Sequence, residues 1–370
     1  MSGQTQPEIY LTVTDDKIGM TGFLVVESTE RGPGKGGLRM TSGVTLEEVA
    51  RLAHTMTWKN ALFELPFGGA KSGIIWPGGD AAKKEAFVRS FANQIKKYIP
   101  EKYVAGPDVN TGETEMVWIA DETGLWGAST GKPSAYCAEI DDKKYCGLPH
   151  ELGSTGFGVA VSTIATAKLM KLVPAETSVG IHGFGNVGTF AAKHLLEAGF
   201  KVVLLAGSKG ATYRPDGFTL EEVEAVMAKT KKLDDLPGEK KTDEEFWATP
   251  VDILIPASVT NVINETNHAS IKTKLMVEGG NIPMTDQIEK VLHDRGIITV
   301  PDFVANGGGI ISSYAELQGS SPTKMFDLVT AKITKATAAV MEKSLADNLY
   351  PRQVALELAK ANLAAKAVTV

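Results

Sequence analysis

The sequence of 370 residues contains only two cysteines, Cys137 and Cys146, and they are not arranged as a Cys-x-x-Cys pair. Two cysteines do not make a disulfide framework for a chain of this length. We therefore expect two reduced thiols in a loop-rich segment, with a redox or metal role as the alternative.

Basic clusters and long apolar runs are also missing. The formal net charge is −6, the sequence pI is about 5.7, and no block of Lys and Arg stands out. The first ten residues lack the apolar core of a signal peptide, and no apolar stretch is long enough to span a bilayer. These absences argue against nucleic acid or a membrane as the main partner and predict a cytoplasmic protein.

The length and the order of the apolar segments predict two domains of the α/β class. In the middle third of the chain, short apolar runs alternate with helical or polar segments, which indicates βα units and a parallel sheet. The expected strands are residues 178–181, 201–205, 251–256, 275–277 and 297–300.

The last part of the chain has a helical pattern, in which Pro322 and Pro351 stand where a helix begins. These helices bring no sheet of their own, so we expect them to return to the first domain. The predicted organisation is a mixed α/β domain, residues 1–150 and 311–370, and a Rossmann-type parallel-sheet domain, residues 151–310.

The strand expected at 178–181 leads into a GxGxxG sequence, Gly183-Phe184-Gly185-Asn186-Val187-Gly188. A helix and a second strand follow, which is the context of a dinucleotide-binding fingerprint. Gly183 permits the tight turn, Gly185 lets the backbone approach a pyrophosphate, and Gly188 lets helix and strand pack closely. We expect these six residues to bind NAD or NADP; the alternative is a glycine turn without a ligand.

The residues after the second strand bear on the choice between the two cofactors. NAD-binding domains usually carry an acidic residue there, about 20 residues beyond the glycines. Here the strand leads into Ala206-Gly207-Ser208-Lys209. Because Ser208 and Lys209 could contact a 2′-phosphate, the sequence favours NADP, or the use of both cofactors.

A helix is expected to begin at Thr45, because Thr45 and Glu48 have the spacing of a capping box. One apolar face consists of residues at helical spacing, namely Val49, Leu52, Met56, Lys59 and Phe63. Lys59 would thus face the core, where an unpaired ammonium is costly. Its ammonium either reaches solvent at the rim or points into a cleft and binds a carboxylate.

Two further lysines lie among glycines. Lys71 follows Gly68-Gly69-Ala70, and Lys35 stands in Gly34-Lys35-Gly36-Gly37. A lysine in a glycine loop beside another cation suits proton transfer, and Asp108, which follows Pro107, is a candidate partner. The alternatives are an ordinary surface lysine and an Asx turn after the proline.

Together these segments resemble the glutamate/leucine/phenylalanine/valine dehydrogenase family from about Phe23 to the C-terminal helices. The similar segments are GPGKGGLRM (32–40), MTWKNALFELPFGGAKSGI (56–74), PDVNT (107–111), STGFG (154–158), GFGNVG (183–188), VDILIPAS (251–258), EGGN (278–281) and ANGGGIISSYAE (305–316). The resemblance implies oxidative deamination of an L-amino acid by NAD(P), with release of ammonia and a 2-oxo acid. It also implies a homo-oligomer, with a hexamer favoured.

The resemblance assigns roles to residues of both domains. Lys71 matches the catalytic lysine that activates the attacking water, and Asp108 matches the carboxylate that moves protons to and from the amino group. The expected ligands of the substrate α-carboxylate and amino group are Lys59, Gly36, Gly37 and Asn306. The expected cofactor contacts outside the GxGxxG are Thr155, Ala257 and Asn281, in addition to Ser208 and Lys209 inferred above.

The substrate side chain is implied by two positions. Glutamate-specific members of the family have a lysine before the GG and a serine after the later glycine run, and here these are Lys35 and Ser313. A buried cation facing an alkyl side chain would lack a partner, so the resemblance favours L-glutamate. The chain departs from the family pattern in a short N-terminal region, in the segment Ser134–Leu152 and at Ser72, where glycine is common.

Two alternatives remain: a leucine-, valine- or phenylalanine-type dehydrogenase, and a catalytically silent NAD(P)-binding regulator. The joint presence of Lys59, Lys71 and Asp108 argues against the regulator. The six histidines form no constellation of the kind that a 2-hydroxyacid dehydrogenase needs. A zinc-dependent alcohol dehydrogenase would need more cysteines.

Overall fold

The structure is a computed structural model and describes residues 7–229 and 233–365. The chain forms two compact units. The first comprises the described parts of Met1–Leu152, Ile310–Leu328 and Leu358–Val370; the second comprises those of Gly153–Gly309 and Val329–Glu357.

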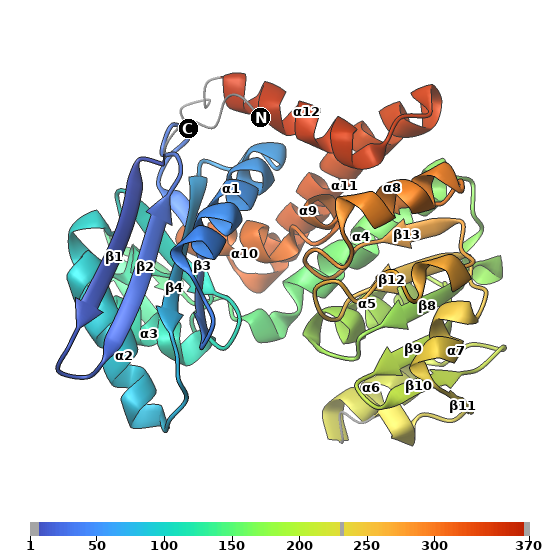
Figure 1. The fold of residues 1–370 in the computed structure, drawn as a ribbon, viewed down its shortest axis with the longest axis horizontal. Helices are drawn as coiled ribbons and strands as arrows, with labels where there is room; N and C mark the ends of the chain where they lie inside the picture. Colours follow the sequence, from blue (N-terminus) through green and yellow to red (C-terminus); the bar gives the residue numbers. More distant parts are fainter. Residues whose placement is uncertain (1–6, 230–232, 366–370) are drawn as a thin grey trace. The chain divides into compact units, whose positions relative to one another are not determined.

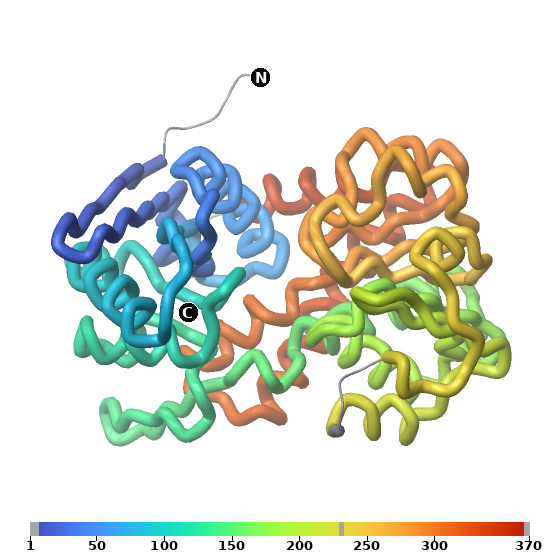
Figure 2. The backbone as a smooth tube through the Cα atoms, turned by 60° about the horizontal axis from the view of Figure 1, so that its bottom comes forward, coloured from blue at the N-terminus to red at the C-terminus, as the bar shows by residue number. Residues whose placement is uncertain are grey.

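The first unit is built on a five-stranded sheet in the order β1-β2-β4-β3-β5 (Figure 1). The β1–β2 hairpin, dark blue in Figure 2, pairs antiparallel with β4, whereas β3 is parallel to both β4 and β5. The strands are β1 (Ile9–Asp15), β2 (Met20–Val26), β3 (Gly34–Thr41), β4 (Gly68–Ile75) and β5 (Tyr103–Pro107).

Helices cover both faces of this sheet. On one face, residues of α2 (Ala81–Ile95) and α3 (Glu113–Thr123) pack with Leu24, Leu38 and other strand residues into the main core of the unit. On the other face, α1 (Leu46–Leu62) packs on β2 and β4.

The helix α1 begins as the sequence predicts, because the Thr45 hydroxyl accepts a hydrogen bond from Glu48 N at 3.2 Å. The expected apolar face is wrong in part. Val49 is buried together with Ala53 and Thr57, whereas Lys59 is only half-buried. The reason is Gly69 of β4, where an added Cβ would lie 1.9 Å from the Thr57 hydroxyl. The helix therefore approaches the sheet through its small residues.

The two glycine segments that hold Lys35 and Lys71 are strands and not loops. Both strands are almost entirely buried. Each is paired on both edges, β3 with β4 and β5 and β4 with β2 and β3, and this pairing fixes the position of Lys35 and Lys71. Glycine is unfavourable in isolated strands, but here it permits close approach of neighbouring backbone and side chains.

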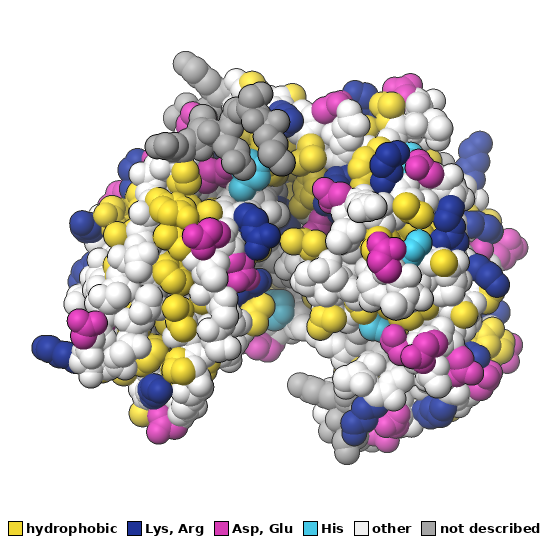
Figure 3. All heavy atoms as spheres, viewed as in Figure 1, with side chains coloured by type: hydrophobic (Ala, Val, Ile, Leu, Met, Phe, Trp, Pro, Cys, Tyr) yellow, Lys and Arg dark blue, Asp and Glu magenta, His cyan; other side chains and the backbone are white. Residues whose placement is uncertain are grey.

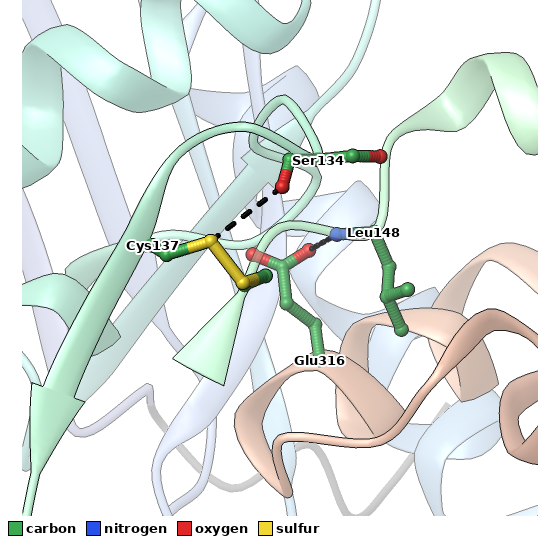
Figure 4. The surroundings of a disulfide bond; sticks show 5 residues. Ser134, Cys137, Leu148 and Glu316 are labelled. Carbon is green, nitrogen blue, oxygen red and sulfur yellow. Dashed lines mark hydrogen bonds between the residues drawn. A yellow bond between two sulfur atoms is a disulfide. The ribbon is translucent and has the colours of Figure 1, made fainter. Parts of the chain in front are cut away.

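The two cysteines form a disulfide, so the expectation of reduced thiols is wrong. They face each other across the hairpin of β6 (Cys137–Ile140) and β7 (Lys143–Cys146), within the segment that departs from the family pattern. Where the hairpin returns to the unit, Leu148 N donates to Glu316 Oε2 at 2.9 Å (Figure 4). A register that places both cysteines opposite each other could not be predicted from their spacing of nine residues.

The second unit has a seven-stranded sheet in the order β11-β10-β9-β8-β12-β13-β14. Strands β9, β8, β12, β13 and β14 are parallel to one another, as expected. Strands β10 and β11 add an antiparallel edge that the sequence did not reveal. The strands are β8 (Ser178–His182), β9 (Lys201–Gly207), β10 (Gly210–Tyr213), β11 (Glu239–Lys241), β12 (Ile253–Pro256), β13 (Leu275–Val277) and β14 (Ile298–Val300).

The remaining elements are helices. The α-helices are α4 (Ser154–Leu169), α5 (Asn186–Glu197), α6 (Leu220–Lys229), α7 (Asp243–Ala248), α8 (Asp286–Asp294), α9 (Asp302–Ala305), α10 (Gly308–Leu317), α11 (Pro322–Asp347) and α12 (Pro351–Ala364). The short 3₁₀ helices are η1 (Lys96–Tyr98), η2 (Trp126–Ala128), η3 (His150–Leu152), η4 (Pro174–Glu176), η5 (Leu233–Asp235) and η6 (His268–Ser270). Pro322 and Pro351 are first helical residues, as predicted.

The compact units differ from the expected domains in the C-terminal helices. The sequence analysis assigned all of 311–370 to the first domain, whereas Val329–Glu357 belongs to the second unit. Within that unit, the Ser162 hydroxyl of α4 and the Thr337 hydroxyl of α11 lie 2.9 Å apart, and Arg352 of α12 pairs with Glu278. A helical pattern does not state which sheet its apolar face covers.

The surface carries charges of both signs. On the face that Figure 3 shows, Lys and Arg side chains are interspersed with Asp and Glu side chains and form no continuous basic patch. None of the helices in the described ranges combines the length and the apolar character that crossing a bilayer requires.

The disulfide predicts that purified protein contains no free thiol. Cys137 is exposed, so a reduced thiol there would react readily with an alkylating reagent in the native state. We expect no alkylation without a reductant and the addition of two labels, measured by mass spectrometry, after reduction and unfolding. Labelling of both cysteines in the native, unreduced protein would contradict the pairing.

Candidate functional site

The two residues expected to move protons are brought together in the first unit. Lys71, buried in β4, places Nζ 2.7 Å from Asp108 Oδ2, at the end of β5. Arg39 of β3 donates to the same oxygen from Nε at 3.1 Å. Both cations therefore bind Oδ2, and among the described residues none donates to Oδ1. Oδ1 is therefore available as a hydrogen-bond acceptor.

The charge of Asp108 is maintained by these partners. Burial by itself would raise the pKa of its carboxyl group, but the nearby Lys71 and Arg39 outweigh it and hold the pKa below its ordinary value. Arg39 is in turn held by Glu48 of α1, whose Oε1 lies 2.5 Å from Nη1. Asp108 thus remains an ionised carboxylate at neutral pH, ready to accept a proton.

Glycines leave space beside these charges. An added Cβ at Gly37 would lie 2.7 Å from Asp108 Cβ and 3.2 Å from Lys71 Nζ. An added Cβ at Gly106 would lie 2.6 Å from Lys35 Nζ. Gly36 faces the opposite side, where an added Cβ would overlap Ala70 O at 1.7 Å. Side chains at these positions would displace the ammonium groups or part the strands.

The two residues expected to select the substrate side chain meet through a shared neighbour. Lys35 Nζ donates to Ala105 O at 2.8 Å, and the Thr130 hydroxyl lies 3.5 Å from the same carbonyl oxygen. Thr130 also donates to the Ser313 hydroxyl of α10 at 2.9 Å. Lys35 and Ser313, 278 positions apart in sequence, therefore belong to one polar cluster in the first unit.

Lys35 has an unusual environment for an ammonium group. Burial lowers its pKa from 10.5 to about 7, with Glu316 opposing the shift and Lys132 and Lys71 adding to it. Lys132 is itself fully buried, 2.7 Å from Glu316 Oε1 and over the ring of Trp126. The charge of Lys35 near neutral pH thus depends on whether an anion lies beside it.

Lys59, the expected ligand of the α-carboxylate, lies in the last turn of α1. Its side chain is half-buried and already interacts with a neighbouring group. Its position on the same face of the sheet as Lys71 is compatible with binding a carboxylate.

The expected dinucleotide turn has the predicted form in the second unit. Gly183, directly after β8, has a φ of 116°, which favours glycine, and an added Cβ there would lie 2.7 Å from the Ala257 backbone. An added Cβ at Gly188 would overlap Gly183 O at 1.8 Å, whereas one at Gly185 would meet nothing within 4 Å. Gly185 caps α5, so open space lies at a helix N-terminus, as a pyrophosphate requires.

The other residues of the fingerprint surround that turn. Asn186 and Val187 form the first turn of α5, and Val187 O would lie 2.5 Å from an added Cβ at Gly156 of α4. Phe184 packs near Gly207 at the end of β9. The geometry fits a dinucleotide whose pyrophosphate lies on Gly185.

Two elements of opposite charge lie near the end of β9. Ser208 and Lys209 form the exposed turn between β9 and β10, where the sequence expected them. The sequence analysis missed η5, whose Leu233 packs on Gly207 and is followed by the exposed carboxylates of Asp234 and Asp235. A cation suits a 2′-phosphate and a carboxylate suits a free 2′-hydroxyl, so the geometry leaves both cofactors open.

Three more of the expected residues converge in the second unit. Asn306, which ends α9, donates from Nδ2 to Asn281 Oδ1 at 3.0 Å and to the carbonyls of Gly279 and Gly280 at 3.3 Å each. Thr155 lies in the first turn of α4, and its hydroxyl would lie 2.8 Å from an added Cβ at Gly309.

Several residues of the site escaped the sequence analysis. Arg39 stands within the GPGKGGLRM segment, two positions after Gly37, and this period-two spacing on a strand was the available signal. Thr130, Lys132 and Glu316 gave no such signal, because no local pattern pairs residues of α10 with a loop as far along the chain as Thr130 is from Ser313, 183 positions.

Comparisons with known proteins agree with this arrangement. Residues 147–368 match the family model described as Glutamate/Leucine/Phenylalanine/Valine dehydrogenase. Residues 6–124 match the model described as Glu/Leu/Phe/Val dehydrogenase, dimerisation domain. The NADP-specific glutamate dehydrogenase of Saccharolobus shibatae is 36% identical over 84% of this chain and 74% of that protein.

Two further proteins represent the other cofactor and a solved assembly. The NAD-specific glutamate dehydrogenase of Peptoniphilus asaccharolyticus is 35% identical over 80% of this chain and 72% of that protein. The crystal structure of the hetero-hexameric glutamate dehydrogenase of Thermus thermophilus, in a Leu-bound form, has a TM-score of 0.80 at 30% identity. It is matched over 96% of this chain and 88% of that chain.

The glycine turn predicts opposite effects of two similar substitutions. Gly185→Ala should leave the melting temperature unchanged, because its Cβ meets nothing, and should weaken binding of reduced NAD(P) by ~10-fold or more, since the methyl group occupies the approach of the pyrophosphate. Gly188→Ala should destabilise the fold by roughly 1–3 kcal/mol or more. Calorimetric melting and cofactor fluorescence measure both, and unimpaired binding by Gly185→Ala would place the pyrophosphate elsewhere.

Proposed function

The chain belongs to the glutamate/leucine/phenylalanine/valine dehydrogenase family, and from this premise we propose that it catalyses the NAD(P)-dependent oxidative deamination of L-glutamate to 2-oxoglutarate and ammonia, and the reverse reaction. It is an amino-acid dehydrogenase that uses NAD or NADP.

The observation that supports glutamate is the surplus of positive charge on one face of the first unit. The described ion pairs there join three cations to three carboxylates, namely Arg39, Lys71 and Lys132 with Glu48, Asp108 and Glu316, and leave Lys35 as a fourth basic side chain. Lys35 bonds only to a carbonyl oxygen among these partners. A leucine or phenylalanine side chain would leave that ammonium without an anion, whereas a γ-carboxylate would complete it.

The reaction proceeds on the side chains around Asp108. Lys59 and the backbone at Gly36 and Gly37 hold the α-carboxylate, while Lys35, with Ser313 nearby, holds the γ-carboxylate. Bound NAD(P) supplies the acceptor for the hydride that leaves the α-carbon. Asp108 first takes a proton from the substrate ammonium group, which frees the nitrogen electron pair for the loss of hydride. Lys71, as the neutral amine, takes a proton from the water that attacks the resulting iminium carbon. Asp108 returns its proton to the nitrogen, and ammonia leaves as the new hydroxyl group gives its proton to Asp108 and becomes the carbonyl of the 2-oxo acid.

The proposed substrate and cofactor contacts are distributed over both units. The first unit supplies the residues for the amino acid, and the second supplies the glycine turn, Thr155, Ala257, Ser208, Lys209 and Asn281 for the cofactor and Asn306 for the substrate amino group. The cofactor is NADP or both NADP and NAD, given the cationic turn beside an acidic one.

The assembly and location follow from the same premise. The chain forms a homo-oligomer, for which a hexamer is favoured by the hexameric relative and by the dimerisation-domain match. The cytoplasm is the proposed location, where 2-oxo acids and both nicotinamide cofactors are in supply. The disulfide, which is rare in that compartment, would then be found reduced in the cell.

Initial rates test the proposed substrate. We expect purified protein to oxidise L-glutamate far faster than leucine, valine or phenylalanine, with either NADP or NAD. In Lys35→Leu, the kcat/KM for glutamate should fall by ~100-fold or more, because a buried charge-paired contact is lost, while binding of reduced cofactor is unchanged. Preferential oxidation of the apolar amino acids by the unaltered protein would sink the proposal.

The lowered pKa of Lys35 predicts a pH dependence. Its charged form is present below about pH 7 and is lost as the pH rises through that value. We therefore expect the ratio of kcat/KM for L-glutamate to that for L-norvaline, which lacks the γ-carboxylate, to decline above about pH 7. The limiting slope is ~10-fold per pH unit, since kcat/KM reports the free enzyme. Because norvaline has the same α-amino and α-carboxyl groups as glutamate, the ratio removes the pH dependence that arises from their binding. A ratio independent of pH would mean that Lys35 does not bind the substrate side chain.

A further inference from the structure

Arg352, the second residue of α12, pairs with three carboxylates of the second unit at 3.1 Å or less, and its Nε lies 3.9 Å from Oδ1 of the exposed Asp286. Its Nη2 lies 2.7 Å from Glu278 Oε2, its Nε 2.5 Å from Glu289 Oε2 and its Nη1 3.1 Å from Asp302 Oδ1. Glu278 and Glu289 are fully buried. Burial raises the pKa of both glutamates, and the guanidinium opposes that shift. Removal of the Arg352 guanidinium would leave the carboxylates of Glu278 and Glu289 buried without a positive charge, which is strongly destabilising. These ion pairs therefore hold Arg352 in place.

Two of these carboxylates hold opposite ends of one short segment, residues 278–282. Glu278 begins the segment, and its Oε2 also accepts a hydrogen bond from Asp302 N at 2.7 Å. Asp302 Oδ2 accepts from Ile282 N, the end of the segment, at 3.0 Å. Arg352 therefore acts on both ends of the segment at once, although it contacts neither Asn281 nor Gly280 in the described contacts.

The segment needs such support. Ile282 has a φ of 49°, a conformation that β-branched residues disfavour. Strained backbone of this kind persists only where the surroundings determine it. Two hydrogen bonds hold the strained residue. Ile282 O accepts from Asn261 N at 2.9 Å. Ile282 N donates to Asp302, which Arg352 positions.

The same support reaches Asn306. Asp302 is the first residue of α9, and Asn306 N donates to Asp302 O at 2.8 Å. The amide of Asn306 then binds three oxygens of the segment, at Gly279, Gly280 and Asn281. Segment 278–282 and Asn306 thus form one rigid unit with Arg352 at its base.

We propose that Arg352 is a positioning residue for the reaction: through Glu278 and Asp302 it fixes segment 278–282 and Asn306 in the conformation that orients the nicotinamide end of the cofactor and the substrate amino group. This inference rests on the proposed function, because Asn281 and Asn306 take their roles from it. The pyrophosphate contacts at Gly183–Gly188 lie outside its reach. Arg352 therefore affects turnover much more than the affinity for the cofactor, of whose contacts only Asn281 lies in the segment.

The test compares Arg352→Lys with a matched control. Lysine keeps the charge but offers one ammonium in place of the planar fork, so it cannot bind Glu278, Glu289 and Asp302 together. Arg295→Met removes another guanidinium of the same unit, which donates to His268 O and Ile271 O, both at 2.7 Å. Arg295 bonds neither the segment nor its supports in the described contacts.

We expect kcat for glutamate in Arg352→Lys to fall by ~10- to 100-fold, the effect of a displacement near 1 Å, while the dissociation constant for reduced NAD(P) changes by less than ~3-fold. Amide hydrogen exchange of residues 279–282 should become faster. In Arg295→Met, both kcat and exchange in the segment should stay at the values of the unaltered protein.

Other results would overturn the inference. A merely structural role lowers the melting temperature of Arg352→Lys without changing kcat per folded molecule, or reduces kcat equally in Arg295→Met. Unchanged exchange at 279–282 would also contradict it. If the unaltered protein does not oxidise glutamate at all, the proposed function fails, and hydrogen exchange alone still decides whether Arg352 fixes the segment.

Discussion

The burial of several like charges on one face of a sheet is the constraint on which the first unit depends. Lys35 and Lys71 are buried on neighbouring strands, with the partly exposed Arg39 beside them, and burying an ammonium group costs several kcal/mol unless a partner is supplied. Asp108 supplies one partner for two of them through a single oxygen. Glycines of β3, β4 and β5 give the charges room and allow the strands to remain paired. A face built in this way is incomplete without an anion, which is why it suits a dicarboxylate.

The second unit follows a different principle, since its ligand is expected to bind mainly to backbone. The open space at Gly185, between the tightly packed Gly183 and Gly188, comes from the turn between β8 and α5. The neighbouring segment 278–282 is held by buried carboxylates around Arg352. In both units, therefore, the residues that would meet ligand are fixed by contacts made behind them.

Sequence patterns were sufficient where one local signal decides the structure. The parallel strands after residue 177, the start of α1 at Thr45 and the helix starts at Pro322 and Pro351 were confirmed. Sequence patterns failed where packing against residues far along the chain decides the structure. Glycines suggested loops at Lys35 and Lys71, because only the neighbouring strands show that these segments are paired. The buried face of α1, the disulfide register and the meeting of Lys132 with Glu316 likewise depend on partners far along the chain.

In the proposed mechanism, Lys71 and Asp108 carry out proton transfer, while the glycine turn of the second unit holds the cofactor. The most direct measurement is glutamate oxidation by Lys71→Ala together with fluorescence titration of reduced cofactor. The account predicts a loss of ~100- to 10,000-fold in kcat, the usual contribution of a general acid–base group, with cofactor affinity unchanged and partial rescue of turnover by added small primary amines. Retained turnover, or a parallel loss of cofactor binding, would contradict it.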